Sequence, residues 1–247
     1  MATATPTGTP TRAVVLGARN LGAAITRDLL GRGGHVATIA RTPADLEPLQ
    51  ALGAATIRAN AADRTALDDA LRAAASHIGP LDLIVNAVAP ARPPNDGTGF
   101  GGGAMREATP AGFDEWVVAV ARQTFVFLAA GAAALAGQGG TLVQITGAPA
   151  RRAAPSRGLV AAGAAATRAL THAAALELAA DDLHVALLIV DGPIASPKTA
   201  RMTASMAAEA IVDPAGVAAA VHALATQPAR AWTHELVVTP AGGRWVP

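Results

Sequence analysis

The chain has 247 residues, of which 51% are hydrophobic, and its formal net charge is +1. It contains no cysteine, which excludes disulfides and thiolate metal sites, and its near-neutral charge excludes the broad basic surface of a nucleic-acid-binding protein. This length predicts one domain with a large apolar core, and we expect neither a nucleic-acid partner nor a bound metal.

The chain begins with a threonine- and proline-rich segment, residues 1–12, that lacks the apolar core of a signal peptide. We interpret this segment as a flexible tail and residues 13–247 as a single domain. The longest apolar stretch, residues 116–137, contains Arg122 and Gln123. Because a central arginine costs roughly 2.5–3.5 kcal/mol on membrane insertion, we expect a buried helix of a cytoplasmic protein that does not bind membranes.

Residues 13–41 read as a strand, a turn, a helix and a second strand. The apolar run 13–16 leads at once into a turn that holds Gly17 and Gly22. Asn20 tolerates a positive φ better than most residues and is a candidate to replace a third glycine. Such a turn lets the backbone approach a pyrophosphate at the start of the helix. The alternative is a strand–helix turn that binds nothing.

The alternation of strands and helices continues to the end of the chain. Apolar runs predict further strands at residues 55–59, 81–85, 141–146, 184–190 and 235–238. Helical periodicity predicts helices at residues 43–52, 65–77, 111–137, 159–179 and 214–225. We expect a long loop over 90–110 and a mobile helical flap over 197–210. This pattern predicts a Rossmann-like, doubly wound α/β fold with a seven-stranded, mostly parallel sheet, helices on both faces and ligands at the carboxyl ends of the strands.

Five short motifs in this order resemble the short-chain dehydrogenase/reductases, from about residue 11 to residue 243. They are the Gly17–Gly22 turn, Asn60-Ala61-Ala62-Asp63, Asn86-Ala87-Val88-Ala89, the helix residues Leu170-Thr171 with Ala175-Leu176-Glu177-Leu178, and Asp191-Gly192-Pro193-Ile194-Ala195-Ser196. The resemblance implies a nicotinamide cofactor. The residues that it places at the cofactor are Gly17, Arg19, Asn20, Leu21, Gly22, Arg41, Asn60, Ala61, Asn86, Ala87, Val88, Ile145, Ile194 and Ser196.

The resemblance ends at the residues with which this family reduces a carbonyl. The family uses a tyrosine as acid, a lysine that lowers the pKa of this tyrosine, a serine that binds the oxygen and an asparagine that relays protons. Alignment of the motifs places Gly147, Val160 and Ala164 at the serine, tyrosine and lysine positions, and Gln123 (or Arg122) at the asparagine position. The chain contains no tyrosine at all, and its only lysine is Lys198.

Two residues are candidates for a replacement catalytic role. Asp191 lies where the nicotinamide is expected, and burial there would raise its pKa and make it an acid. The alternative is that Asp191 caps the turn before Gly192. Gln123 is the second candidate. Arg151 and Arg152 are placed to bind an anionic substrate, or are solvated loop charges.

The cofactor preference follows from the end of the second strand. Members of the family that use NAD carry an acid there, whereas this chain has Ala40 followed by Arg41, and Arg19 lies in the glycine turn. Two guanidinium groups bind a phosphate well, so we expect NADP(H). The alternative is that both arginines face solvent.

Three functions remain open from the sequence. The first is an NADPH-dependent reductase with a replaced proton donor, acting for example on an activated alkene or imine. The second is a non-catalytic NADPH-binding protein or subunit. The third is a non-redox cyclase or isomerase that uses the pocket for its shape. In each case we expect a small-molecule ligand and a homo-oligomer, dimer or tetramer, because family members pair through the helices that correspond to 111–137 and 159–179.

Overall fold

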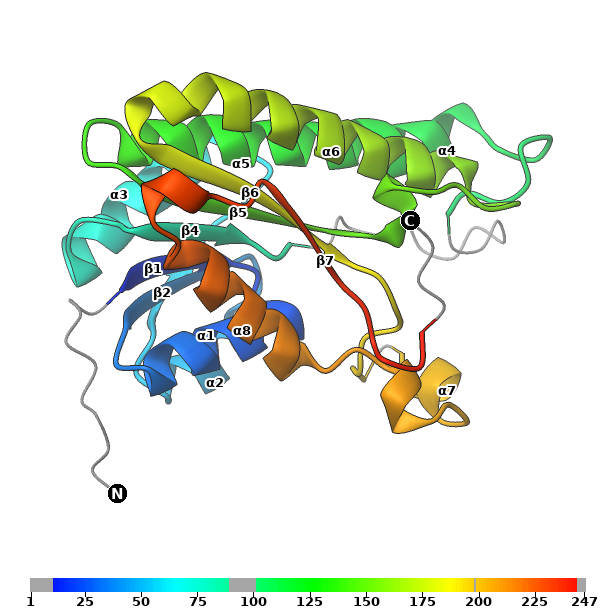
Figure 1. Ribbon diagram of the computed structural model, residues 1–247, viewed down its shortest axis with the longest axis horizontal. Coiled ribbons are helices and arrows are strands. Elements are labelled where there is room, and N and C mark those ends of the chain that lie inside the picture. The colour runs from blue at the N-terminus through cyan, green and yellow to red at the C-terminus, as the bar shows by residue number, and fades with distance from the viewer. Residues whose placement is uncertain (1–10, 89–100, 198, 244–247) are drawn as a thin grey trace.

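The computed structural model describes residues 11–88, 101–197 and 199–243, in which strands and helices alternate (Figure 1). The strands are β1 (Arg12–Leu16), β2 (His35–Ala40), β3 (Ala55–Arg58), β4 (Leu83–Asn86), β5 (Gly140–Gly147), β6 (Leu183–Val190) and β7 (Glu235–Val238). The α-helices are α1 (Leu21–Gly31), α2 (Pro43–Gln50), α3 (Arg64–Ile78), α4 (Pro110–Phe113), α5 (Ala119–Leu135), α6 (Gly158–Leu178), α7 (Ala200–Thr203) and α8 (Pro214–Ala225).

The strands form one sheet in the order β3-β2-β1-β4-β5-β6-β7, and all six pairings are parallel. The strand order reverses between β1 and β4, which makes the carboxyl edge of these strands the expected place for a ligand. The seven-stranded, doubly wound fold predicted from the sequence is therefore confirmed.

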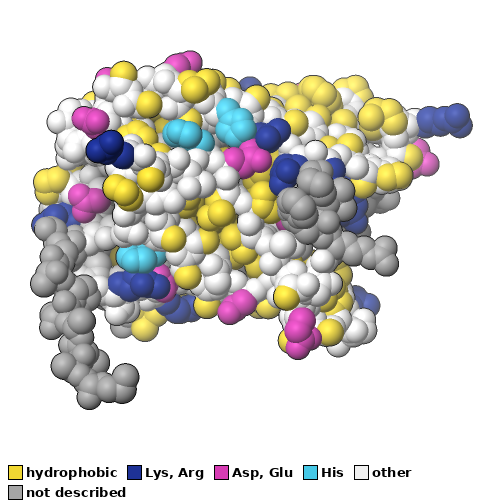
Figure 2. Space-filling view, in the orientation of Figure 1, with side chains coloured by type: hydrophobic (Ala, Val, Ile, Leu, Met, Phe, Trp, Pro, Cys, Tyr) yellow, Lys and Arg dark blue, Asp and Glu magenta, His cyan; other side chains and the backbone are white. Residues whose placement is uncertain are grey.

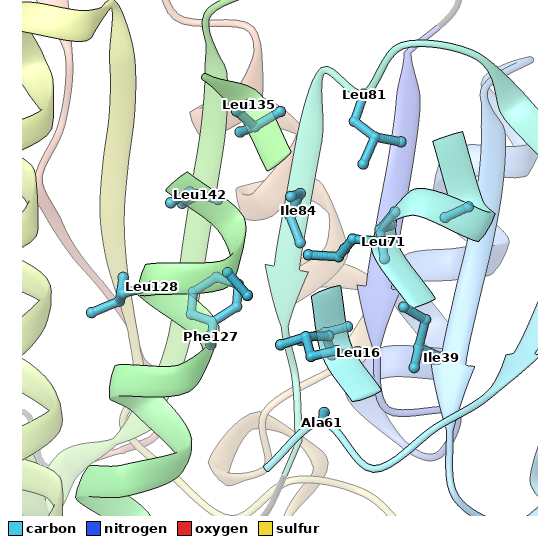
Figure 3. Close-up of a cluster of buried hydrophobic side chains, with 14 of the residues drawn as sticks. Leu16, Ile39, Ala61, Leu71, Leu81, Ile84, Phe127, Leu128, Leu135 and Leu142 are labelled. Atoms are coloured by element: carbon cyan, nitrogen blue, oxygen red, sulfur yellow. The ribbon is translucent and has the colours of Figure 1, made fainter. Parts of the chain in front are cut away.

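Apolar side chains fill the space on both faces of the sheet. The face covered by α3, α5 and α6 is centred on Phe127, which is fully buried between α5 and the strands (Figure 3). The other face packs against α1 and α8, and its core includes Ile25 and Val221. Both layers rest on the central strands, of which β4 and β6 are buried along their whole length, as parallel strands are when helices cover both sides.

The structure corrects several predicted boundaries. Arg12, which we assigned to the tail, is the first residue of β1, and its backbone N–H donates to Asp82 Oδ2 at 2.8 Å. The predictions for residues 1–10 and for most of the 90–110 loop, up to residue 100, lie outside the described residues. The predicted flap contains α7 and a single 3₁₀ turn, Ala208–Ala210, in place of one helix.

The two long apolar helices belong to one layer of this fold. The stretches Pro110–Leu135 and Gly158–Asp181 are long and apolar enough to cross a membrane by length and composition, and 39% of the apolar window of each is buried. They pack against each other so closely that a Cβ on Gly163 would lie 2.0 Å from the carbonyl oxygen of Trp116. A buried hydrogen bond of 3.0 Å also joins the hydroxyls of Thr124 and Thr167. Both stretches therefore belong to the helical layer that covers one face of the sheet.

Candidate functional site

The turn between β1 and α1 has a geometry that only small residues permit. Gly17 has a φ of +99°, and a Cβ there would lie 3.1 Å from the carbonyl oxygen of Ala87. A Cβ on Gly22 would lie 1.9 Å from the carbonyl oxygen of Gly17. Asn20 has a φ of +46°, so it takes the positive-φ position proposed for it from the sequence. Asn20 therefore has the positive φ that a glycine would otherwise supply.

This turn leads directly into the first turn of α1. Leu21 is buried at the helix start, whereas Asn20 is exposed and its side chain makes no capping hydrogen bond. Helix N-terminal N–H groups and the helix dipole attract anions. Because Gly17 and Gly22 carry no Cβ, the turn packs closely against Ala87 and the start of α1 lies directly behind it.

Three arginines lie at the corner formed by β1, β2 and β3. Arg19 Nε is 3.5 Å from Asp45 Oδ2, in the first turn of α2. Arg41 follows β2 and is exposed. Arg58, at the end of β3, donates from Nε to the carbonyl oxygen of Arg41 at 3.3 Å. The sequence analysis identified Arg19 and Arg41 but not Arg58 or Asp45, because the pairing of β2 with β3 is not visible in sequence spacing.

Asn60 and Ala61 lie just beyond β3, at the same edge of the sheet. Asn60 Oδ1 accepts a hydrogen bond of 3.2 Å from the N–H of Ala62, and this bond shapes the turn that leads into α3. Ala61 is buried in the core under α3. The position of Asn60 is open to an adenine, while Ala61 holds the loop to the sheet.

A buried amide network lies under the carboxyl ends of β4 and β5. Asn86 Nδ2 donates to Gln144 Oε1 at 2.7 Å and to Gln123 Oε1 at 3.1 Å, and Gln123 Nε2 donates back to Asn86 Oδ1 at 3.1 Å. The N–H of Val88 also donates to Asn86 Oδ1, at 3.2 Å. Gln144 completes the network by donating to the carbonyl oxygen of Ile145.

All three amide side chains of this network are at most 5% exposed. Both polar atoms of Gln123 are engaged inside it, which gives this residue a structural role in addition to the catalytic one predicted for it. The sequence analysis missed Gln144, although a glutamine inside an apolar strand is a signal of a buried polar contact.

Asp191 forms a two-point ion pair with Arg152. Both carboxylate oxygens of Asp191 accept hydrogen bonds of 2.7 Å, one from each terminal nitrogen of Arg152, and these bonds raise the pKa of the guanidinium. Asp191 is 8% exposed. Both oxygens of Asp191 thus contact Arg152, which gives this carboxylate an anchoring contact, and its role as an acid stays a prediction. This contact also differs from the predicted turn cap, because the partner is a side chain. Beside this pair lies a pocket lined by Arg152, Arg157 and the small residues between 148 and 154.

The three positions that the resemblance aligns with the family's serine, tyrosine and lysine lie on β5 and α6. Gly147 is the last residue of β5, and Val160 and Ala164 lie on successive turns at the start of α6. Gly101 lies directly against Val160, because a Cβ on Gly101 would lie 3.0 Å from Val160 Cγ1. Ala164 is 7% exposed. Gly101 and Gly102 therefore pack against the first turn of α6, at Val160 and Leu159.

The segment after β6 is fixed by local bonds. Ile194 forms a parallel bridge with Val212, and its carbonyl oxygen accepts a hydrogen bond from the hydroxyl of Thr199. The hydroxyls of Ser196 and Thr199 are 2.9 Å apart. Ile145, on β5, packs with Ile194 against the core on the α1 side of the sheet. These residues thus lie at the carboxyl edge of the sheet, as predicted for the nicotinamide side.

Comparison with known proteins places this geometry in a family. A family model described as "Enoyl-(Acyl carrier protein) reductase" matches residues 15–242. A search of curated protein sequences gave no match. Three solved structures illustrate the structural similarity, all with sequence identities that establish the fold alone.

The first is the NADPH-bound short chain oxidoreductase of Pseudomonas aeruginosa PAO1 "containing an atypical catalytic center", with a TM-score of 0.81, 20% identity and coverage of 95% of this chain and 97% of that one. The second is an alcohol dehydrogenase of Thermococcus sibiricus complexed with 5-hydroxy-NADP, with a TM-score of 0.76, 20% identity and coverage of 96% and 99%. The third is a metagenomic short-chain oxidoreductase in complex with NADP, with a TM-score of 0.74, 23% identity and coverage of 94% and 98%. With nearly the whole chain matched by the family model and the glycine turn in place, the protein belongs to the short-chain dehydrogenase/reductase family of oxidoreductases.

Proposed function

We propose that this protein is an NADP(H)-binding oxidoreductase with a non-standard active site. The observation that carries this proposal is the β1–α1 turn, in which the missing Cβ atoms of Gly17 and Gly22 let the turn pack tightly against Ala87 and against the start of α1. A tight glycine turn that leads into a helix N-terminus is the arrangement that binds a pyrophosphate. When bound, the cofactor supplies or accepts a hydride. The role of the protein is to hold the phosphates of the cofactor and to orient its nicotinamide ring.

The preference for NADP(H) over NAD(H) rests on charge at the end of β2. The position that carries an acid in NAD-dependent relatives is Ala40 here, and Arg41 and Arg19 lie on either side of the expected ribose. A guanidinium group donates two parallel, charge-assisted hydrogen bonds to the oxygens of a phosphate. Its hydrogen bond to a neutral ribose hydroxyl is weaker. The NADP and NADPH complexes of structurally similar proteins support this choice.

The chemistry that fits the remaining residues is reduction of an activated alkene or imine. Hydride addition to a ketone creates an alkoxide that needs an acid, and the family's acid position holds Val160. An imine that is protonated in solution is an iminium, and hydride addition to it gives a neutral amine. Hydride addition to a conjugated alkene gives an enolate whose charge is delocalised and which takes its proton from water, so neither substrate needs an acid at that position. The description of the matching family model, an enoyl reductase, supports the alkene.

One observation favours a second candidate, a non-catalytic NADPH-binding protein. Gly101 lies against Val160, and the two residues proposed as replacements, Asp191 and Gln123, both have their polar atoms bonded to neighbours. A protein that only senses NADPH, or supports a partner subunit, needs no acid. Turnover of an alkene or imine would reject this candidate.

Titration calorimetry with NADPH and NADH tests the cofactor assignment. A charge-assisted hydrogen bond contributes about 1.5–3 kcal/mol, so Arg41→Ala is expected to weaken NADPH binding about ten-fold or more and to leave NADH nearly unchanged. Equal NADPH affinity in the wild type and the variant would reject the role of Arg41.

We also propose that the protein is a cytoplasmic homo-oligomer that pairs through α5 and α6. Their outward surface exposes Phe125 (55%) and Leu176 (82%), with alanines between them. Hydrophobic side chains gather along the margin of the molecule that these helices form (Figure 2). An exposed apolar patch of this kind marks an interface. Sedimentation at micromolar concentration is expected to give a dimer or tetramer, and a monomer would contradict the proposal.

A further inference from the structure

Arg58 lies on the side of the sheet that faces α2. Side chains alternate along a strand, so Thr56 and Arg58 point to the same face of β3. Thr56 donates a hydrogen bond of 3.5 Å to Gln50 of α2. Ala40, which pairs with Arg58 in the register of β2 and β3, also packs on this face, against Leu46 and Leu49 of α2. Arg58 therefore shares the corner at which Arg41 leaves the sheet.

The side chain of Arg58 folds over this corner. Its Nε donates to the carbonyl oxygen of Arg41 at 3.3 Å. That bond occupies one of the five N–H groups of the guanidinium and leaves those on the two terminal nitrogens. Arg58 is exposed, so these groups meet solvent, and a ligand at the corner is able to reach them.

The charges at the corner are unbalanced. Across residues 11–88, 101–197 and 199–243, Arg19 is paired with Asp45, whereas Arg41 and Arg58 form no ion pair with a carboxylate. Three guanidinium groups and one carboxylate leave two net positive charges. A phosphate monoester carries about −1.5 to −2 charges at pH 7, so a single such group would balance the corner.

We propose that Arg58 is a third residue, with Arg19 and Arg41, that binds the 2′-phosphate of NADP(H). This inference rests on the proposed cofactor function and extends it to a residue on β3. Arg58 has two effects in this arrangement. It contributes its own charge and terminal N–H groups, and through its bond to the Arg41 carbonyl it fixes the backbone from which the Arg41 side chain extends.

The test uses two small probes and needs no catalytic activity. Adenosine 2′,5′-bisphosphate carries the 2′-phosphate and adenosine 5′-monophosphate lacks it, so the ratio of their affinities isolates this group. Titration calorimetry on the full chain is expected to give about a ten-fold or larger loss of bisphosphate affinity in Arg58→Ala, with monophosphate affinity changed by less than about two-fold. Arg58→Lys keeps a point charge without the planar fork and is expected to lie between the wild type and Arg58→Ala.

Arg72→Ala is the matched control, because Arg72 is also an exposed arginine but lies on α3, where it pairs with Asp69. It is expected to leave both affinities unchanged, and a thermal melt confirms that each variant is folded. If the wild type prefers the bisphosphate and Arg58→Ala retains that preference, the role of Arg58 is wrong while NADP(H) binding stands. If the wild type binds the two probes equally well, both the role of Arg58 and the proposed preference for NADP(H) are wrong.

Discussion

The two halves of the carboxyl edge differ in what their residues still offer to a ligand. On the β1–β3 side, the tight turn of Gly17 and Gly22 leads into the start of α1, and Arg41 and Arg58 are exposed to solvent. On the β4–β6 side, the polar side chains are bonded to one another, as in the ion pair of Asp191 with Arg152. The arginines of the first half face solvent, whereas these polar side chains of the second half bond to one another.

This contrast has a physical origin. Binding of a dinucleotide depends on backbone geometry and on positive charge, and both tolerate wide changes in sequence. Acid catalysis depends on one proton donor at one place. A chain of this family can therefore change its proton donor and still keep the fold and a site for phosphates.

The largest expected effect from a single substitution is at Gly22. In Gly22→Ala the new Cβ would lie 1.9 Å from the carbonyl oxygen of Gly17, so the helix and the turn must separate. Overpacking of this kind costs about 1–3 kcal/mol, and we expect NADPH affinity to fall about ten- to a hundred-fold, as measured by calorimetry.

Gly31→Ala is the matched control for this prediction. Gly31 is the last residue of the same helix, and no atom lies within 4 Å of a Cβ built there. Replacing glycine by alanine in a helix is favourable by up to about 1 kcal/mol, so this variant is expected to bind NADPH as the wild type does. A Gly22→Ala protein with unchanged affinity would mean that the turn does not hold the cofactor.

A smaller effect is expected on the other half of the edge. Asp191→Ala removes the carboxylate and leaves Arg152 without its two-point partner, at a site where the aspartate is 8% exposed. Hydrogen bonds to charged groups contribute about 1.5–3 kcal/mol. Because the Arg152 side chain is 37% exposed and solvent screens its charge, we expect the free energy of unfolding to fall by about the lower of these two values.

Chemical denaturation of Asp191→Ala and Arg152→Ala, with the double variant to complete the cycle, measures this coupling. If Asp191→Ala keeps full stability and instead loses turnover of a substrate, Asp191 is the acid predicted from the sequence. The ion pair with Arg152 would then not be its main role.

The sequence predicted the fold well, because the fold depends on local patterns. The apolar runs of Val14 to Leu16 and Leu187 to Val190 are strands, and the periodicity of Ile25 and Leu29 marks a helix. The positive φ of Asn20 was also predictable, because few other residues adopt it. These features depend on neighbours in the sequence.

The candidate site was predicted less completely, because it depends on contacts between distant residues. Arg58 meets Arg41 across two paired strands, and Arg152 meets Asp191 across 39 residues. Gln144 reads from the sequence as one polar residue in a strand, and only the fold brings it to Asn86. Sequence spacing identified which residues lie at the edge but not which of them neutralise one another.

The central claim is that this chain retains NADPH binding and has lost ketone reduction. The most direct measurement follows the fluorescence of NADPH mixed with the protein, first alone and then with an excess of an ordinary ketone. We predict that NADPH fluorescence rises to saturation as the protein binds the cofactor. After the ketone is added, we predict that this fluorescence decays no faster than the uncatalysed rate, because general acid catalysis contributes about 10²–10⁴-fold to the rate. NADPH fluorescence that does not rise would contradict NADPH binding. Rapid decay of the fluorescence after the ketone is added would reveal a proton donor and would contradict the predicted absence of ketone reduction.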